Sequence, residues 1–168
     1  MRPIKAAARP IRAAARPAGL PLWLSTWFGA GLLPRAPGTF GSLAALPFAW
    51  GLMLLGGPWL LLGGTVAVFV VGLWASARYM TIVGVDDPGA ICIDEVVGQW
   101  LTLLAAPLDP LAYLLGFVLF RIADIAKPWP ASWADRAVGG PIGVMLDDLI
   151  AAAYAGPTLF LVVQALPA

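Results

Sequence analysis

The 168-residue sequence contains no histidine and only one cysteine. Without histidine there is no imidazole base, no phosphohistidine intermediate and no histidine ligand for a metal. The single cysteine, Cys92, excludes a disulfide within the chain and a cysteine-rich zinc site. A thiol phosphatase needs an arginine shortly after its nucleophile, and residues 92–108 contain none. Cys92 is therefore interpreted as a small hydrophobic residue.

Charged residues are also scarce in this chain. They make up 11% of it, whereas 61% of the residues are hydrophobic and eight are tryptophan. A soluble domain of this size has about 25% charged residues. The composition predicts an all-α integral membrane protein with one compact domain, because no long polar linker divides the chain.

The N-terminal segment is basic and of low complexity. The sequence "AAARP" occurs at 6–10 and again at 13–17. Prolines interrupt the segment and no clean apolar core with a cleavage site follows, which argues against a cleavable signal peptide. We expect residues 1–19 to be a disordered tail that sets topology and touches anionic lipid, and residues 20–168 to form the membrane domain. The aromatic residues at 21–31 suit the headgroup region.

Five apolar stretches follow, and they predict a helical bundle with about four to five membrane helices. Tight turns are predicted at "GGP" (56–58) and "PLDP" (107–110). A helix needs roughly 20 residues to cross a bilayer core of about 30 Å, so the third and fourth stretches are short for a full crossing. The five stretches are 41–56, 58–77, 93–107, 110–123 and 144–166.

The positions of the charges predict the orientation of the bundle. With the N-terminus in the cytoplasm, all ten basic residues fall inside and the turns at 56–58 and 107–110 have none. The same layout leaves only Asp109 outside among the nine acidic residues. The other eight come from three segments and are predicted to converge at the cytoplasmic face. They are Asp86, Asp87, Asp94, Glu95, Asp124, Asp135, Asp147 and Asp148.

The motif "DDPGAICIDEVVGQW" (86–100) supplies four of these acids. It puts Asp94 and Glu95 in the first turn of the third helix, where the helix dipole favours anions. These two residues are therefore either ordinary helix-start acids or part of a polar strip that continues into the membrane.

The motif "FRIADIAKPWP" (120–130) combines cations with an acid at the end of the fourth helix. Arg121 and Asp124 are three residues apart and share a face, with Lys127 one turn further if the helix continues. One interpretation is a cluster of snorkelling side chains at the membrane interface. The other is an anion clamp, in which the cations bind phosphate oxygens and Asp124 orients Arg121 or binds metal.

The motif "GTFGSL" (38–43) opens the first helix with small and hydroxyl residues. Backbone amides and hydroxyls at a helix N-terminus form a natural phosphate site, which makes Thr39, Gly41 and Ser42 candidates for binding substrate phosphate. The alternative is simple capping by Thr39 or Ser42.

The stretch "IGVMLDD" (142–148) ends in two adjacent carboxylates, which we place at the start of the last helix. Together with Asp94, Glu95 and Asp124 they would repel one another unless a cation lay between them. Oxygen ligands without nitrogen or sulfur favour Mg²⁺. These features predict metal-dependent phosphoryl chemistry on a lipid. A transporter or channel subunit with a carboxylate-lined ion site is the alternative, although an ion path would distribute acids through the membrane depth.

Four motifs together resemble the phosphatidylglycerophosphatase A family of bacterial inner-membrane enzymes, from about Gly31 to Ala153. The resemblance implies Mg²⁺-dependent hydrolysis of phosphatidylglycerophosphate, an anionic phospholipid, to phosphatidylglycerol and inorganic phosphate, with no nucleic-acid partner. One departure is Ala123, where the family usually has a bulky aromatic residue. The motifs are "GLLPRAPGTFGSL", "DDPGAICIDEVVGQW", "FRIADIAKPWP" and "VGGPIGVMLDDLIA".

The resemblance also implies a functional set of seven residues, and we divide their roles by inference. Asp94, Asp147, Arg121 and Lys127 are predicted to be catalytic, and both cations also to bind substrate phosphate. Glu95, Asp124 and Asp148 are predicted to bind the metal. Adjacent helix positions point about 100° apart, so only one of Asp147 and Asp148 is expected to face the metal. We assign Asp148 as the ligand and Asp147 as its partner.

Overall fold

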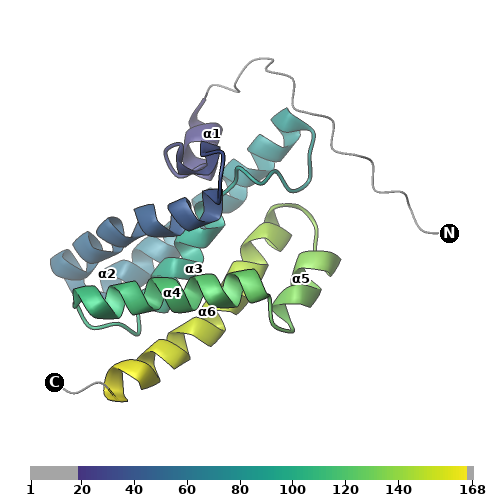
Figure 1. The fold of residues 1–168 in the computed structure, drawn as a ribbon. Helices are drawn as coiled ribbons and strands as arrows, with labels where there is room; N and C mark the ends of the chain where they lie inside the picture. Colours follow the sequence, from purple (N-terminus) through teal and green to yellow (C-terminus); the bar gives the residue numbers. More distant parts are fainter. Residues whose placement is uncertain (1–18, 166–168) are drawn as a thin grey trace.

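The computed structural model describes residues 19–165, and every regular element within that range is a helix. The predicted all-α class is confirmed for this part of the chain. The predicted basic tail, apart from Gly19, lies outside the described residues. The elements are α1 (Leu20–Ser25), η1 (Ala30–Leu32), α2 (Pro37–Val83), α3 (Ile93–Leu103), α4 (Pro110–Ala126), α5 (Ala131–Ala137) and α6 (Gly140–Ala165) (Figure 1).

The long helix α2 is a hairpin of two helical arms. Its continuity is broken at Gly56 and at Gly57, whose φ of +63° favours glycine. The chain turns back at this point in Figure 1. A side chain added at Gly64 would come within 3.0 Å of Leu52, so the two arms pack against each other. The predicted turn after the first apolar stretch is therefore confirmed.

The next two helices are short, as the third and fourth apolar stretches predicted. α3 has 11 residues and α4 has 17. At about 1.5 Å per residue they measure about 16 and 26 Å, less than the bilayer core of about 30 Å. The predicted turn between them is confirmed, and Asp109 caps α4 there by accepting a hydrogen bond from the amide of Ala112 (2.9 Å).

The last helix begins earlier than predicted. α6 begins at Gly140 rather than at residue 144, because Pro141 in its first turn has a φ suited to a helix. Asp147 and Asp148 therefore lie about two turns inside α6. Their predicted position at the start of this helix is wrong.

Two short helices have no counterpart among the predicted apolar stretches. α1 packs against α2, and the amide of Cys92, directly before α3, donates to the carbonyl of Ser25 at its end (2.9 Å). α5 packs against α6 and buries Ala131 and Ala134. Both helices are too short for a hydrophobic period to appear in the sequence.

α3 is the central helix of the bundle. The indole of Trp100 donates to the carbonyl of Ala45 in α2 (2.9 Å). A Cβ at Gly98 would lie 2.5 Å from the ring of Phe120 in α4 and 3.0 Å from the carbonyl of Asp148 in α6. The backbone can approach these helices because position 98 has no side chain. α3 is therefore enclosed by α2, α4 and α6.

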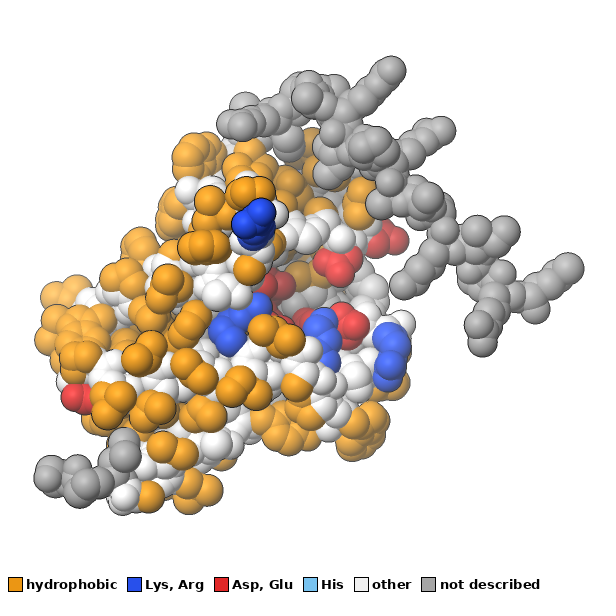
Figure 2. Space-filling view, in the orientation of Figure 1, with side chains coloured by type: hydrophobic (Ala, Val, Ile, Leu, Met, Phe, Trp, Pro, Cys, Tyr) orange, Lys and Arg blue, Asp and Glu red, His pale blue; other side chains and the backbone are white. Residues whose placement is uncertain are grey.

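The outside of the bundle is largely apolar. Many large hydrophobic side chains on α2, α4 and α6 are exposed, as expected for surfaces in contact with lipid. Among residues 19–165, α2 and α6 are long and apolar enough to cross a membrane, by length and composition. Charged side chains instead gather around a hollow at one end of the molecule (Figure 2).

Candidate active site

A cavity of about 250 Å³ lies at this charged end of the bundle. The starts of α2, α3 and α6 line it together with the end of α4 and the segment before α3. All eight acidic residues predicted to converge line this one cavity, as Figure 2 illustrates for the visible face. The convergence is confirmed. An ion path is not favoured, because the acids crowd one end and are not spread along the helices.

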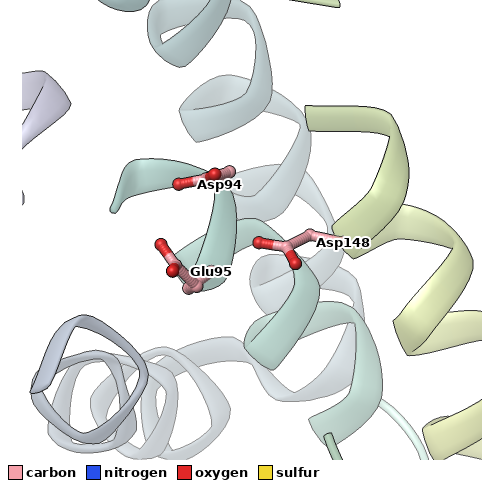
Figure 3. A group of neighbouring side chains, drawn as sticks. All are labelled: Asp94, Glu95 and Asp148. Carbon is pink, nitrogen blue, oxygen red and sulfur yellow. The ribbon is translucent and has the colours of Figure 1, made fainter. Parts of the chain in front are cut away.

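Asp94, Glu95 and Asp148 form the innermost group in the cavity. One carboxylate oxygen of each lies within 4.8 Å of the other two. Figure 3 shows the three side chains around one space between α3 and α6. Asp94 and Asp148 are only 8% and 3% exposed. Carboxylates so close and so buried repel one another unless a cation or protons lie between them.

The free oxygens in this group fit a hard divalent cation. Asp94 Oδ1, Glu95 Oε2 and Asp148 Oδ2 are buried and have no hydrogen-bond partner within residues 19–165. An all-oxygen donor set suits Mg²⁺, which completes its six ligands with water and substrate phosphate. Asp94 therefore joins Glu95 and Asp148 in the group best arranged to hold a metal.

Asp124 lies beside this group and pairs with a cation. Its Oδ2 is 2.5 Å from Nη1 of Arg121, three residues earlier on α4, and the same nitrogen is 3.8 Å from Glu95 Oε1. Of the two roles that the sequence leaves open for Asp124, this geometry favours orienting Arg121. The Nε of Arg121 is buried without an acceptor in the described chain, and Arg121 itself does not line the cavity but lies behind Glu95 and Asp124, which do.

Lys127 reaches the cavity by a route that the sequence did not predict. α4 ends at Ala126, and Lys127 adopts a left-handed conformation (φ 44°) just before Pro128. Its ammonium contacts Asp135 in α5 and lies 2.7 Å from Asp147 Oδ2 in α6. Burial lowers the pKa of Lys127, but the two carboxylates outweigh it, so the net shift of the pKa is upward. The lysine therefore stays protonated.

Gly41 and Ser42 are engaged in packing. A Cβ at Gly41 would lie 2.9 Å from that of Cys92, and the buried hydroxyl of Ser42 donates to the carbonyl of Gly38 (2.9 Å). Neither residue lines the cavity, and neither does Thr39. The capping alternative is wrong, since no side chain caps α2. Phosphate binding by this motif stays a prediction.

Cys92 is buried directly before α3. Burial raises the pKa of its thiol, and the negative charges of Glu95 and Asp94 raise it further. A thiol that does not ionise is a poor nucleophile. The interpretation of Cys92 as a small hydrophobic residue is supported by this environment.

Gly38 is a site residue that the sequence analysis did not single out. It lines the cavity, and an added Cβ would overlap the carboxylate of Glu95 and lie 3.1 Å from Nη1 of Arg121. The missing side chain is what allows Glu95 and Arg121 to meet over the first turn of α2. In the sequence, the one feature that could have indicated Gly38 is its position directly before Thr39, in the motif proposed to bind phosphate.

Gly38→Ala is therefore expected to displace Glu95 and to lower the rate of phosphate release by at least about tenfold. Gly51→Ala is the matched control, because position 51 is also in α2 and an added Cβ there meets nothing within 4 Å. Phosphate release should be measured on both purified variants. Equal rates in the two would remove Gly38 from the site.

A family model described as phosphatidylglycerophosphatase A matches residues 23–163. The chain belongs to the phosphatidylglycerophosphatase A family. This confirms the family that the four motifs resemble, and with it the predicted enzyme class, a phosphomonoester hydrolase. All ten predicted site residues, from Thr39 to Asp148, fall inside the matched range.

Three similar proteins each match most of the chain. The phosphatidylglycerophosphatase A of Escherichia coli K12 is 42% identical over 141 residues, covering 83% of this chain and 81% of that protein. The Haemophilus influenzae protein of the same name is 38% identical over 138 residues, covering 82% and 85%. A Bacteroides thetaiotaomicron protein, named as a candidate phosphatidylinositol-3-phosphatase, is 38% identical over 143 residues, covering 80% and 88%. No solved structure matches the chain.

Proposed function

We propose that this member of the phosphatidylglycerophosphatase A family hydrolyses phosphatidylglycerophosphate to phosphatidylglycerol and inorganic phosphate with Mg²⁺ as its cofactor. Its relatives from E. coli and H. influenzae carry the name of this activity. The observation that supports a metal cofactor is the buried group of three carboxylates, each with an oxygen that has no hydrogen-bond partner within residues 19–165. Phospholipid biosynthesis is the setting of this reaction.

Asp94, Glu95 and Asp148 would hold the ion. When bound, it neutralises phosphoryl charge and lowers the pKa of the attacking water. This proposal moves Asp94 into the ligand set and Asp124 out of it, because Asp124 is paired with Arg121 at 2.5 Å. The division of the remaining roles stays as the sequence suggested.

Two cations would bind the phosphate oxygens of the lipid. Lys127 is the more accessible, with 32% of its side chain exposed against 15% for Arg121. Substrate phosphate would replace Asp135 or Asp147 as the partner of the ammonium. Arg121, held by Asp124, would offer its remaining donors to a second oxygen. The planar guanidinium suits a phosphate group better than a point charge does.

Asp147 is proposed as the base. It lines the cavity beside Asp148, and its carboxylate lies 2.7 Å from the ammonium of Lys127, which favours the charged form against the effect of burial. As the water oxygen bonds to phosphorus and the bond to the glycerol oxygen breaks, Asp147 would take the proton from water. The same proton can then pass to the departing glycerol oxygen.

The cavity is proposed to face the cytoplasm, with the N-terminus on that side and four to five helices in the bacterial inner membrane. The distribution of basic residues supports this orientation. The exposed apolar surfaces of α2, α4 and α6 support the membrane setting. The short helix α3 is enclosed by its neighbours and need not cross the bilayer alone.

The metal dependence leads to a direct experiment. Phosphate release by the purified protein is expected to stop in EDTA and to return on addition of Mg²⁺, because the buried carboxylates need a divalent counterion. The assay should offer phosphatidylglycerophosphate beside phosphatidylinositol 3-phosphate, with and without Mg²⁺. Undiminished turnover in metal-free buffer would exclude the metal site, and faster hydrolysis of the inositol lipid would assign another substrate.

A further inference from the structure

A second, apolar groove lies between α3 and α6, outside the charged cavity. Its volume is about 630 Å³, and its lining has no charged residue. Leu101 in α3 and Ala152, Gly156 and Phe160 in α6 mark its length. None of these residues belongs to the site described above.

The groove continues along the two helices that carry the innermost carboxylates. Leu101 follows Asp94 by seven residues and Ala152 follows Asp148 by four, spacings that keep each pair on one face of its helix. At about 1.5 Å per residue, the groove begins about 10 Å from Asp94 along α3 and about 6 Å from Asp148 along α6. Its far end at Leu161 is about 20 Å from Asp148.

We infer that this groove holds one acyl chain of the lipid whose phosphate enters the cavity. The inference rests on the proposed function, since a lipid phosphomonoester has its apolar chains joined to the reacting headgroup. One leaflet of the bilayer core is about 15 Å deep, so the groove matches the depth that a chain occupies below its headgroup. An acyl chain in the groove leaves the headgroup beside Asp94 and Asp148.

Small residues form the floor of the groove. Gly156 is not required for close packing of the helices, since an added Cβ would have its nearest neighbours, atoms of Thr102, at 3.9 Å. The space beside Gly156 and the exposed Ala153 therefore forms part of the groove. In a bilayer, an acyl chain gains no hydrophobic free energy by leaving other lipid chains. The groove therefore acts by packing and by positioning the headgroup.

The test compares long and short chains on one headgroup. Ala153→Phe fills the groove from an exposed position. Leu114→Phe is the matched control, because Leu114 is exposed and lines a different apolar groove between α2 and α4. The two variants and the wild type are assayed on dipalmitoyl and dihexanoyl phosphatidylglycerophosphate in detergent with Mg²⁺.

Ala153→Phe is expected to lower kcat/KM on the dipalmitoyl lipid by about tenfold, or about 1.4 kcal/mol. Its kcat/KM on the dihexanoyl lipid should stay within about twofold, because chains that short do not extend along the groove. Leu114→Phe should change neither value. An equal loss on both lipids, no loss on either, or the same loss in Leu114→Phe would each overturn the inference.

Photolabelling tests the binding of an acyl chain in the groove independently of the proposed reaction. A phosphatidylglycerophosphate with a diazirine at the end of one acyl chain should label residues 152–161, and Ala153→Phe but not Leu114→Phe should abolish this labelling. Labelling spread evenly over α4 and α6 would overturn the inference. If the wild type releases phosphate from neither lipid, the proposed function fails. The labelling pattern alone then shows whether the groove binds an acyl chain.

Discussion

Asp148→Asn is expected to lower Mg²⁺-dependent phosphate release by about two to three orders of magnitude. The carboxylate of Asp148 is buried and faces Asp94 and Glu95 across the innermost part of the cavity. The amide keeps the size of the side chain but removes a charge and a strong ligand oxygen. Asp147→Asn should lower the rate comparably by another route, because it removes the proposed base and the partner of Lys127 at 2.7 Å.

Stability without metal separates a catalytic role of Asp148 from a structural one. If repulsion among the carboxylates strains the metal-free protein, Asp148→Asn should unfold in detergent without Mg²⁺ at the same temperature as the wild type or higher. Asp147→Asn should not gain stability, because it loses an ion pair. Poor membrane insertion and lower stability of Asp148→Asn with and without Mg²⁺ would make this carboxylate a structural residue.

Asp109→Asn is the matched control for the loss of one carboxylate. Asp109 is the one acidic residue of the nine that does not line the cavity, and it caps α4 from the loop before it. Asparagine is about as good a cap as aspartate. Phosphate release by this variant should therefore match the wild type.

Arg121→Lys is expected to lower the rate by about a hundredfold, although the charge is kept. The guanidinium contacts Asp124 at 2.5 Å and lies 3.8 Å from Glu95, and its buried Nε has no acceptor within residues 19–165. A lysine ammonium cannot hold these positions at once. The loss should appear in kcat as well as in KM, because the clamp acts on the charge that develops in the transition state.

Arg136→Lys provides the comparison for this substitution. Arg136 is exposed in α5 and, within residues 19–165, forms no ion pair with a carboxylate of the cavity, so the rate of Arg136→Lys should stay close to that of the wild type. If Arg121→Lys also has near-normal kinetics, the arginine is a snorkelling residue at the membrane interface. The cluster at the end of α4 would then contribute to anchoring and not to chemistry.

Much of the fold was predictable because the apolar stretches are long and their breaks are strong. Glycine at 56 and 57 and proline at 107 and 110 interrupt helices for local steric reasons, and the structure has its turns there. The start of α6 was misplaced because the predicted apolar stretch begins only at residue 144, after the glycines and the proline at 139–141, whereas Pro141 suits the first turn of a helix. α1 and α5 were missed because helices of 6 and 7 residues show no period of their own.

The sequence was enough to predict most of the residues of the site, but not most of the contacts between them. Local spacing was enough to pair Arg121 with Asp124, three residues apart on one helix. The partner of Lys127 could not be read from spacing, because the left-handed turn at its own position redirects the side chain to Asp135 and Asp147. The role of Gly38 depends on a side chain from α3 and another from α4 meeting over it.

The sequence by itself determined the family, the helical class and the set of acids that gather at one end. These follow from composition, charge placement and motifs, all of which are local. Only the tertiary structure decided that Asp94, Glu95 and Asp148 form the innermost group and that Lys127 lies against Asp135 and Asp147. Distances between side chains of different helices depend on how those helices pack, and Gly98 sets that packing where α3 meets α6.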